Sequence, residues 1–160
     1  MGPRAHRAVR RRPQARRRLG LLRRSTHRST LAFREPVSVN AASLAVCPAD
    51  LRRSVVDEAN EVTGLLGNSP SREALDDVSP ITWITTHAPP VLIVHGTDDQ
   101  IVEFAQGTAL QDALRDANVP VAFREIANAR HEWADTPPSM DSDSDLNFGT
   151  MTADFFDRVL

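Results

Sequence analysis

Two consecutive carboxylates, Asp98 and Asp99, follow closely on a short apolar run at residues 91–94. The run is bounded by two prolines before it and by a glycine after it, which predicts a strand buried on both faces, as in a parallel sheet. Open α/β sheets carry their chemistry at the carboxyl ends of their strands, so a carboxylate here is a candidate for orienting a histidine base. The alternative is that both aspartates only form the turn and cap the next helix. Spacing alone leaves the two interpretations equal.

A second candidate is His131, which follows a predicted strand at residues 121–126 and lies 32 positions after Asp99. An imidazole can take the proton of a nucleophile when a buried carboxylate fixes its tautomer. A single histidine after a strand is more often structural, so the position alone does not assign this role. His131-Glu132 also begins like a helical zinc motif, but position 135 is aspartate where a second histidine is needed. The zinc interpretation therefore fails.

The elements that would hold these side chains alternate between strand and helix from residue 37 onward. A strand, a helix and a second strand at this spacing predict a βαβ unit, and hence an α/β fold with parallel strands. His95 is interpreted as a structural residue at a strand end. The patterns predict strands at 41–47, 91–94 and 121–126, and helices after Ser54, at 72–77, between Asp99 and Asn118, and at 150–160, the last with Met151, Phe155 and Val159 facing inward.

The stretch His95-Gly96-Thr97-Asp98-Asp99-Gln100-Ile101-Val102 resembles the acid-residue loop of α/β-hydrolases. It is most similar to the prolyl-oligopeptidase and dipeptidyl-peptidase type and to related esterases, where His-Gly-x-x-Asp-x-x-Val follows a hydrophobic strand. The resemblance extends from about Val39 to Leu160. It implies that the chain is the C-terminal half of an α/β-hydrolase fold, with Asp99 as the catalytic acid and His131 as the base.

The nucleophile of that family is a serine in Gly-x-Ser-x-Gly, and this motif does not occur in the sequence. Ser38 and Ser43 lack flanking glycines, and Ser25 and Ser29 lie in an Arg-rich segment. Cys47 stands between valine and proline without a tight turn, so a small buried hydrophobe is the better interpretation. We therefore expect a serine hydrolase by descent that acts on ester or peptide bonds but lacks its serine. The alternative is a non-catalytic α/β module that pairs with a partner through its sheet edge.

Charge divides the chain into two unlike parts. Residues 1–34 hold 12 of the 19 basic residues and no acid, whereas residues 35–160 hold 7 arginines and 21 acids. An acid-free arginine segment suits a transit peptide, a nucleic-acid arm or a region without stable structure. It also suits sequence read from a wrong start or a shifted frame, which we favour because the composition changes abruptly. We therefore divide the chain into an Arg-rich segment at 1–36, which is either disordered or non-native, and a partial hydrolase domain at 37–160.

The remaining composition narrows the function classes. The chain has no lysine, which excludes a P-loop lysine and a Schiff-base lysine, and a single cysteine leaves no internal disulfide. Asp141, Asp143 and Asp145 begin like a calcium loop, but Leu146 and Thr152 occupy positions where that loop needs glycine and glutamate. We expect a cytoplasmic protein with no cofactor and no metal. It would bind a small ester or peptide, contact neither nucleic acid nor membrane, and self-associate or pair with a missing N-terminal half.

Overall fold

The computed structural model describes residues 19–23, 32–34, 39–53, 66–67, 69–131 and 147–160. Within these ranges, four strands form one parallel sheet in the order β1-β2-β3-β4, so each strand pairs with its neighbours in the sequence. The strands are β1 (Leu19–Arg23), β2 (Ala41–Ala45), β3 (Val91–Gly96) and β4 (Val121–Ile126), and the helices are α3 (Arg72–Val78), η2 (Pro80–Trp83), α4 (Phe104–Asp116) and α5 (Phe148–Val159). Among the described residues, no helix is long and apolar enough to cross a membrane.

The two central strands are buried along their whole length. Every residue of β2 and of β3 is buried, which is what their uninterrupted small or aliphatic sequences predict for strands covered on both faces. The edge strand β4 differs, because its Arg124 and Glu125 are exposed. Charged side chains on an edge strand discourage pairing with another chain.

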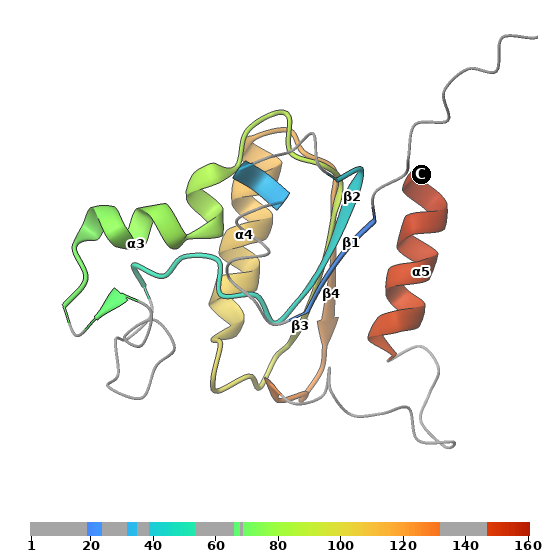
Figure 1. Cartoon of the computed structure of the whole chain (residues 1–160). Coiled ribbons are helices and arrows are strands. Elements are labelled where there is room, and N and C mark those ends of the chain that lie inside the picture. Colours follow the sequence, from blue (N-terminus) through green and yellow to red (C-terminus); the bar gives the residue numbers. More distant parts are fainter. Residues whose placement is uncertain (1–18, 24–31, 35–38, 54–65, 68, 132–146) are drawn as a thin grey trace, which may run out of the picture.

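Helices cover both faces of the sheet, which makes three layers (Figure 1). Helix α4 packs against β3 and β4 on one face, and α5 packs against β2 and β3 on the other. Gly107, Leu110 and Leu114 are buried on the inner face of α4. The helix ends at Asp116, with Ala117 as its C-cap, and so lies within the predicted span between Asp99 and Asn118. Asn118 has a φ of 58° and is followed by a bond from the Val119 amide to the Leu114 carbonyl.

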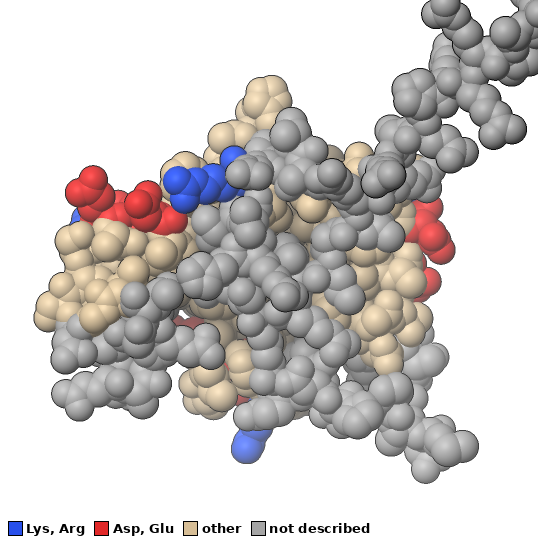
Figure 2. Space-filling view, in the orientation of Figure 1, with Lys and Arg blue, Asp and Glu red and all other residues tan. Residues whose placement is uncertain are grey.

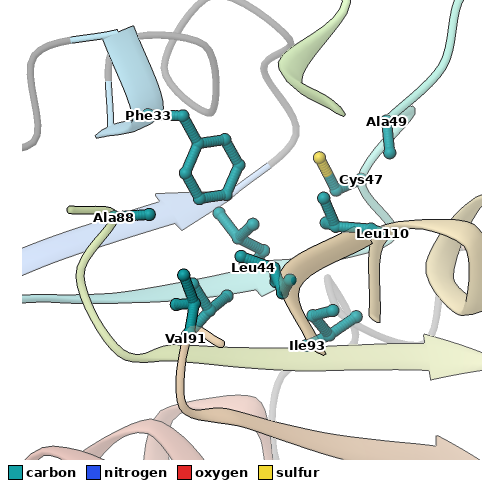
Figure 3. Packing of buried hydrophobic residues seen from close by; sticks show 10 residues of the cluster. Phe33, Leu44, Cys47, Ala49, Ala88, Val91, Ile93 and Leu110 are labelled. Carbon is teal, nitrogen blue, oxygen red and sulfur yellow. The ribbon is translucent and has the colours of Figure 1, made fainter. Parts of the chain in front are cut away.

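Each face of the sheet carries its own hydrophobic core. On the α4 side, Leu44, Val91 and Ile93 meet Leu110 and neighbouring residues (Figure 3). Cys47 belongs to this core and is 4% exposed, which confirms its interpretation as a small buried hydrophobe. On the α5 side, alternate residues of β2 and β3 pack against that helix. This second cluster includes Ala41, Ala45, Leu92, Val94, Phe148 and Phe155.

Helix α5 begins two residues earlier than its sequence pattern predicts. The Asn147 side chain caps it by accepting the amides of Gly149 and Thr150. Phe155 is buried as predicted, but Val159 is 37% exposed, so its predicted inward position is wrong. Thr152 takes part in the inner face instead, because its hydroxyl lies 2.8 Å from that of Ser43 in β2.

The expected boundary at residue 36 is wrong for part of the N-terminal segment. Leu19–Arg23 forms β1, which pairs in parallel with β2 from Leu19 opposite Ala41 to Arg23 opposite Ala45. Ala32 and Phe33 are also buried, at 2% and 1% exposure, and Phe33 joins the core on the α4 side (Figure 3). Hydrogen bonding of the Leu-Gly-Leu-Leu run to an existing strand outweighs the surrounding charge. Apart from Arg34, the rest of the segment lies outside the described residues.

The chain leaves β2 earlier than predicted. The strand ends at Ala45 because Val46 has a φ of 45°, a conformation that a β-branched side chain rarely adopts.

The helix expected after Ser54 and the aspartates at 141–145 lie outside the described residues, whereas the predicted helix at 72–77 is confirmed as α3. Acidic side chains gather over α3 (Figure 2). One of them, Asp76, accepts a bond of 3.0 Å from Arg52 in the loop after β2.

Candidate active site

The loops that follow β3 and β4 begin side by side. The two strands are in register at their carboxyl ends, where Gly96 lies opposite Ile126. Three hydrogen bonds then join the loops: from the Thr97 amide to the Ile126 carbonyl at 3.0 Å, from the Asn128 amide to the Thr97 hydroxyl at 2.9 Å, and from the Asp98 amide to the Ala129 carbonyl at 3.0 Å. The two loops are therefore fixed to each other before either reaches its candidate catalytic residue.

Gly96 allows this close approach. A Cβ atom at this position would lie 2.3 Å from the carbonyl oxygen of Ala129 and 2.8 Å from its carbonyl carbon. Both atoms belong to the backbone, so no side-chain rotation could relieve the overlap. The glycine of the His-Gly-x-x-Asp stretch is thus needed because the loop after β4 passes directly over it.

Asp99 is held by backbone amides of its own turn. Its Oδ1 accepts the amides of Ile101 and Val102, each at 2.9 Å. The carboxylate is completely buried, with a side-chain exposure of 0%. These bonds satisfy Oδ1 from one side and hold the plane of the carboxylate in a fixed direction.

His131 meets this carboxylate. Its Nδ1 lies 2.9 Å from Oδ2 and 3.1 Å from Oδ1 of Asp99, and 12% of its side chain is exposed. A carboxylate accepts the hydrogen of Nδ1, which leaves Nε2 as the basic nitrogen of the neutral ring. The structure thus brings together the two residues that the sequence resemblance indicates, and their contact favours the neutral tautomer with its hydrogen on Nδ1.

Asp98 does not take part in this pair. Its residue is exposed, its amide binds Ala129, and its carbonyl is 3.4 Å from the side-chain nitrogen of Gln100. The turn-forming role that was one of the two interpretations of the aspartate pair therefore describes Asp98. Asp99 makes bonds of both kinds, because it accepts turn amides and also meets a histidine.

A second histidine lies behind Asp99. His95 is fully buried, and its Nε2 is 2.9 Å from the carbonyl oxygen of Val102 and 3.4 Å from Oδ2 of Asp99. Burial lowers the pKa of His95, and the bond to Val102 and the charge of Asp99 only partly oppose this effect. Burial therefore favours the neutral ring. Its interpretation as a residue at a strand end is confirmed, but its contacts with the acid turn were not predicted.

Sequence reasoning also missed a polar junction between the loop after β2 and α4. The buried side chain of Gln106 accepts the amides of Ala49 and Asp50 at 3.1 and 2.7 Å and donates to the Asp50 carbonyl at 3.0 Å. The Asp50 carboxylate binds Arg52, whose hydrogen bonds lower the pKa of Asp50. The one available signal was a glutamine on the otherwise apolar inner face of a predicted helix.

A parallel sheet between two helical layers, with a carboxylate after one strand and a histidine after the next, defines an α/β-hydrolase domain. Residues 24–114 match the family model described as BD-FAE, and the chain belongs to the BD-FAE family. This match begins within the Arg-rich segment, whereas the sequence resemblance was placed from about residue 39. It covers the acid loop and ends before His131.

Individual proteins of known name are similar to parts of this chain. The chain is 43% identical over 56 residues to the esterase LipQ of Mycobacterium tuberculosis, which is 34% of this chain and 13% of that protein. The dipeptidyl peptidase 4 of Porphyromonas gingivalis superimposes on 84% of this chain with a TM-score of 0.67 and 19% identity, over 18% of its own length. An acetyl ester-xyloside bifunctional hydrolase from Caldicellulosiruptor lactoaceticus covers 88% of this chain with a TM-score of 0.66 and 18% identity, over 55% of its own length.

The two structural matches establish the fold, including its likeness to a dipeptidyl peptidase. In each comparison the chain spans only part of the relative, from 13% of LipQ to 55% of the bifunctional hydrolase. The described sheet is thus part of an α/β-hydrolase fold, and the described site consists of the two loops at the carboxyl ends of β3 and β4.

Proposed function

We propose that Asp99 and His131 are the acid and the base of a serine-hydrolase triad that cleaves carboxylic esters. The observation that carries this proposal is the 2.9 Å contact between Nδ1 of His131 and Oδ2 of a fully buried carboxylate. A buried carboxylate on Nδ1 makes Nε2 the proton acceptor and stabilises the imidazolium that forms when a serine hydroxyl attacks a carbonyl.

The same two side chains would act in both halves of the reaction. Nε2 of His131 first takes the proton of the attacking hydroxyl and then gives it to the departing alcohol, which leaves an acyl-enzyme. The imidazole next takes a proton from water, and the resulting hydroxide attacks the acyl carbon. The bond to the serine oxygen then breaks, the acid leaves, and Nε2 returns its proton to the serine oxygen. Asp99 stays ionised throughout, and its role is to orient the ring and offset its positive charge.

Esters are a better proposal than peptides as the substrate class. Among the relatives described above, the one with the highest sequence identity, LipQ, carries the name esterase, and the bifunctional hydrolase is named for an acetyl ester. The dipeptidyl peptidase matches at 19% identity, which supports a shared fold rather than a shared substrate.

The nucleophile must reach the same edge of the sheet. Because the sheet is parallel, the carboxyl end of β1 lies at the edge that carries Asp99 and His131. Ser25 follows two residues after Arg23, but its neighbours are arginine and threonine, and histidine occupies the position of the second glycine. Ser25 itself lies outside the described residues. We therefore keep the proposal that this chain carries the acid and base without a competent serine.

Asp99→Asn is expected to change the tautomer of His131. An asparagine amide can donate to Nδ1, which moves the ring hydrogen to Nε2 and removes the basic nitrogen from the reacting side. Nitrogen NMR of the full chain, at a pH where neutral histidine dominates, should show His131 mainly with its hydrogen on Nδ1. The Asp99→Asn variant should show an increased share of the Nε2–H form.

Asp98→Asn is the matched control, because it makes the same chemical change at the neighbouring exposed position. It should leave the tautomer of His131 unaltered. Equal effects of the two substitutions, or a ring that already carries its hydrogen on Nε2 in the unmodified chain, would contradict the assignment of Asp99 and His131.

A serine-reactive fluorophosphonate tests the missing nucleophile. We expect the purified chain to remain unlabelled and to hydrolyse a short-chain nitrophenyl ester no faster than buffer, because a serine without a strained turn and oxyanion donors is not activated. Intact mass and peptide mapping would measure the labelling. Stoichiometric label on Ser25 would show instead that the chain carries a complete triad, and a Ser25→Ala variant should then lose that label.

A further inference from the structure

His95 occupies an apolar enclosure with one polar side. The ring of Phe104 meets it edge-on at a centroid distance of 5.8 Å, and Phe104 in turn stacks on Phe123 at 5.6 Å. On α4, a Cβ atom at Gly107 would lie 2.7 Å from Nδ1 of His95 and 3.1 Å from the ring of Phe123. The imidazole is thus in contact with the helix backbone and fully buried.

The two ring nitrogens have different surroundings. No hydrogen-bond partner of Nδ1 exists among the described residues, whereas Nε2 lies 2.9 Å from the carbonyl oxygen of Val102. A carbonyl oxygen can only accept a hydrogen bond, so the neutral ring carries its hydrogen on Nε2. A charged ring would place a second N–H in the apolar enclosure, where it would have no acceptor. His95 is therefore a permanent donor toward the acid turn.

Val102 is hydrogen-bonded to both His95 and Asp99. The Val102 carbonyl accepts from His95, and the Val102 amide donates to Oδ1 of Asp99 at 2.9 Å. Nε2 of His95 also lies 3.4 Å from Oδ2 of Asp99, the oxygen that faces His131. A packing role alone would be met by an aromatic ring without nitrogen, which would avoid a buried nitrogen that lacks a partner.

We propose that His95 is a positioning residue for the catalytic acid: by fixing the Val102 peptide it sets the direction in which the Asp99 carboxylate meets His131. This inference rests on the proposed function of the Asp99 and His131 pair. Because Gly107 has no side chain, α4 can lie against the His95 ring, and this ring lies against the turn that holds Asp99. The helix thereby supports the acid through a fully buried side chain.

The test compares His95→Phe with His95→Gln in the full chain. Phenylalanine keeps the ring and removes the donor, whereas a glutamine amide can place a donor near the position of Nε2. Two NMR measurements report the effect: hydrogen exchange of the Ile101 and Val102 amides and the tautomer of His131. We expect His95→Phe to speed exchange of both amides by about 5–10-fold, as for the loss of one hydrogen bond, and to broaden the tautomer distribution. His95→Gln should restore most of both values.

The unmodified chain gives a test that needs no variant. Its His95 should be neutral with the hydrogen on Nε2, and an Nδ1–H form or a charged ring near neutral pH would overturn the donor role even if His95→Phe did not fold. Unchanged exchange and an unchanged His131 tautomer in folded His95→Phe would equally overturn it. Asp99→Asn separates the two proposals: if it alters the His131 tautomer while His95→Phe does not, only the positioning role fails. If Asp99→Asn has no effect, the catalytic pair itself fails.

Discussion

Gly96→Ala is expected to destabilise the chain by about 1–3 kcal/mol and to separate the acid loop from the base loop. The new methyl group would lie 2.3 Å from the Ala129 carbonyl oxygen, so the backbone after β4 must move. That carbonyl accepts the Asp98 amide, and His131 follows two residues later. Movement of Ala129 therefore weakens one of the bonds between the loops and withdraws Nδ1 of His131 from Asp99.

Denaturant unfolding and the His131 tautomer measure the two parts of this prediction. Gly149→Ala serves as the control, because Gly149 is exposed in the first turn of α5 and a Cβ atom there would lie 3.0 Å from the side-chain Oδ1 of Asn147, which can shift, and not against backbone. This substitution should change stability by about 1 kcal/mol or less. If Gly96→Ala has the stability of Gly149→Ala and an intact His131 tautomer, the close packing of the two loops does not hold in solution.

Gln106→Leu is expected to cost about 3 kcal/mol or more of unfolding free energy. Leucine has a similar size but leaves the amides of Ala49 and Asp50 and the carbonyl of Asp50 buried without their partner. Each unsatisfied group costs about 1–3 kcal/mol, and the three costs are only partly additive because the loop can relax. The loss should appear as a lower midpoint in urea with little change in slope.

Gln111→Leu is the matched control on the same helix. Gln111 is only partly buried, so the same substitution removes no buried hydrogen bond there and should change stability by about 0.5 kcal/mol or less. Should the two leucine variants unfold at the same urea concentration, the hydrogen bonds of Gln106 add no net stability, because water replaces them in the variant.

The elements flanking the site could be predicted because their signals are local. Four aliphatic residues between prolines and a glycine predict β3, and the Asn and Pro after Ala117 predict the end of α4. The acid and base were found through the His-Gly-x-x-Asp resemblance, since spacing alone left Asp98 and Asp99 equal. The two aspartates differ in their three-dimensional contacts, because only the Asp99 side chain is directed into its own turn and toward His131.

Other features depended on neighbours that are distant in the sequence. Strand β1 lies in an arginine-rich segment and is a strand because β2 offers its edge, which composition could not indicate. The roles of Gly96 and Gln106 arise from the backbone of Ala129 and of the loop after β2, which lie tens of residues away. A left-handed valine at position 46 also contradicts its own propensity, so no local rule would place it there.

The bonds that join the two loops involve only residues between Thr97 and Ala129. The carboxylate, the imidazole and the contacts that align them are therefore encoded in one unbroken stretch of a single β3-α4-β4 unit. Such a stretch can be transferred as one unit in protein engineering. It could be grafted beside a parallel strand of another protein that presents a serine. Only the register of β3 against that strand would then have to be matched, as β2 and β3 match from Ala42 opposite Val91. The acid and the base would not have to be positioned separately.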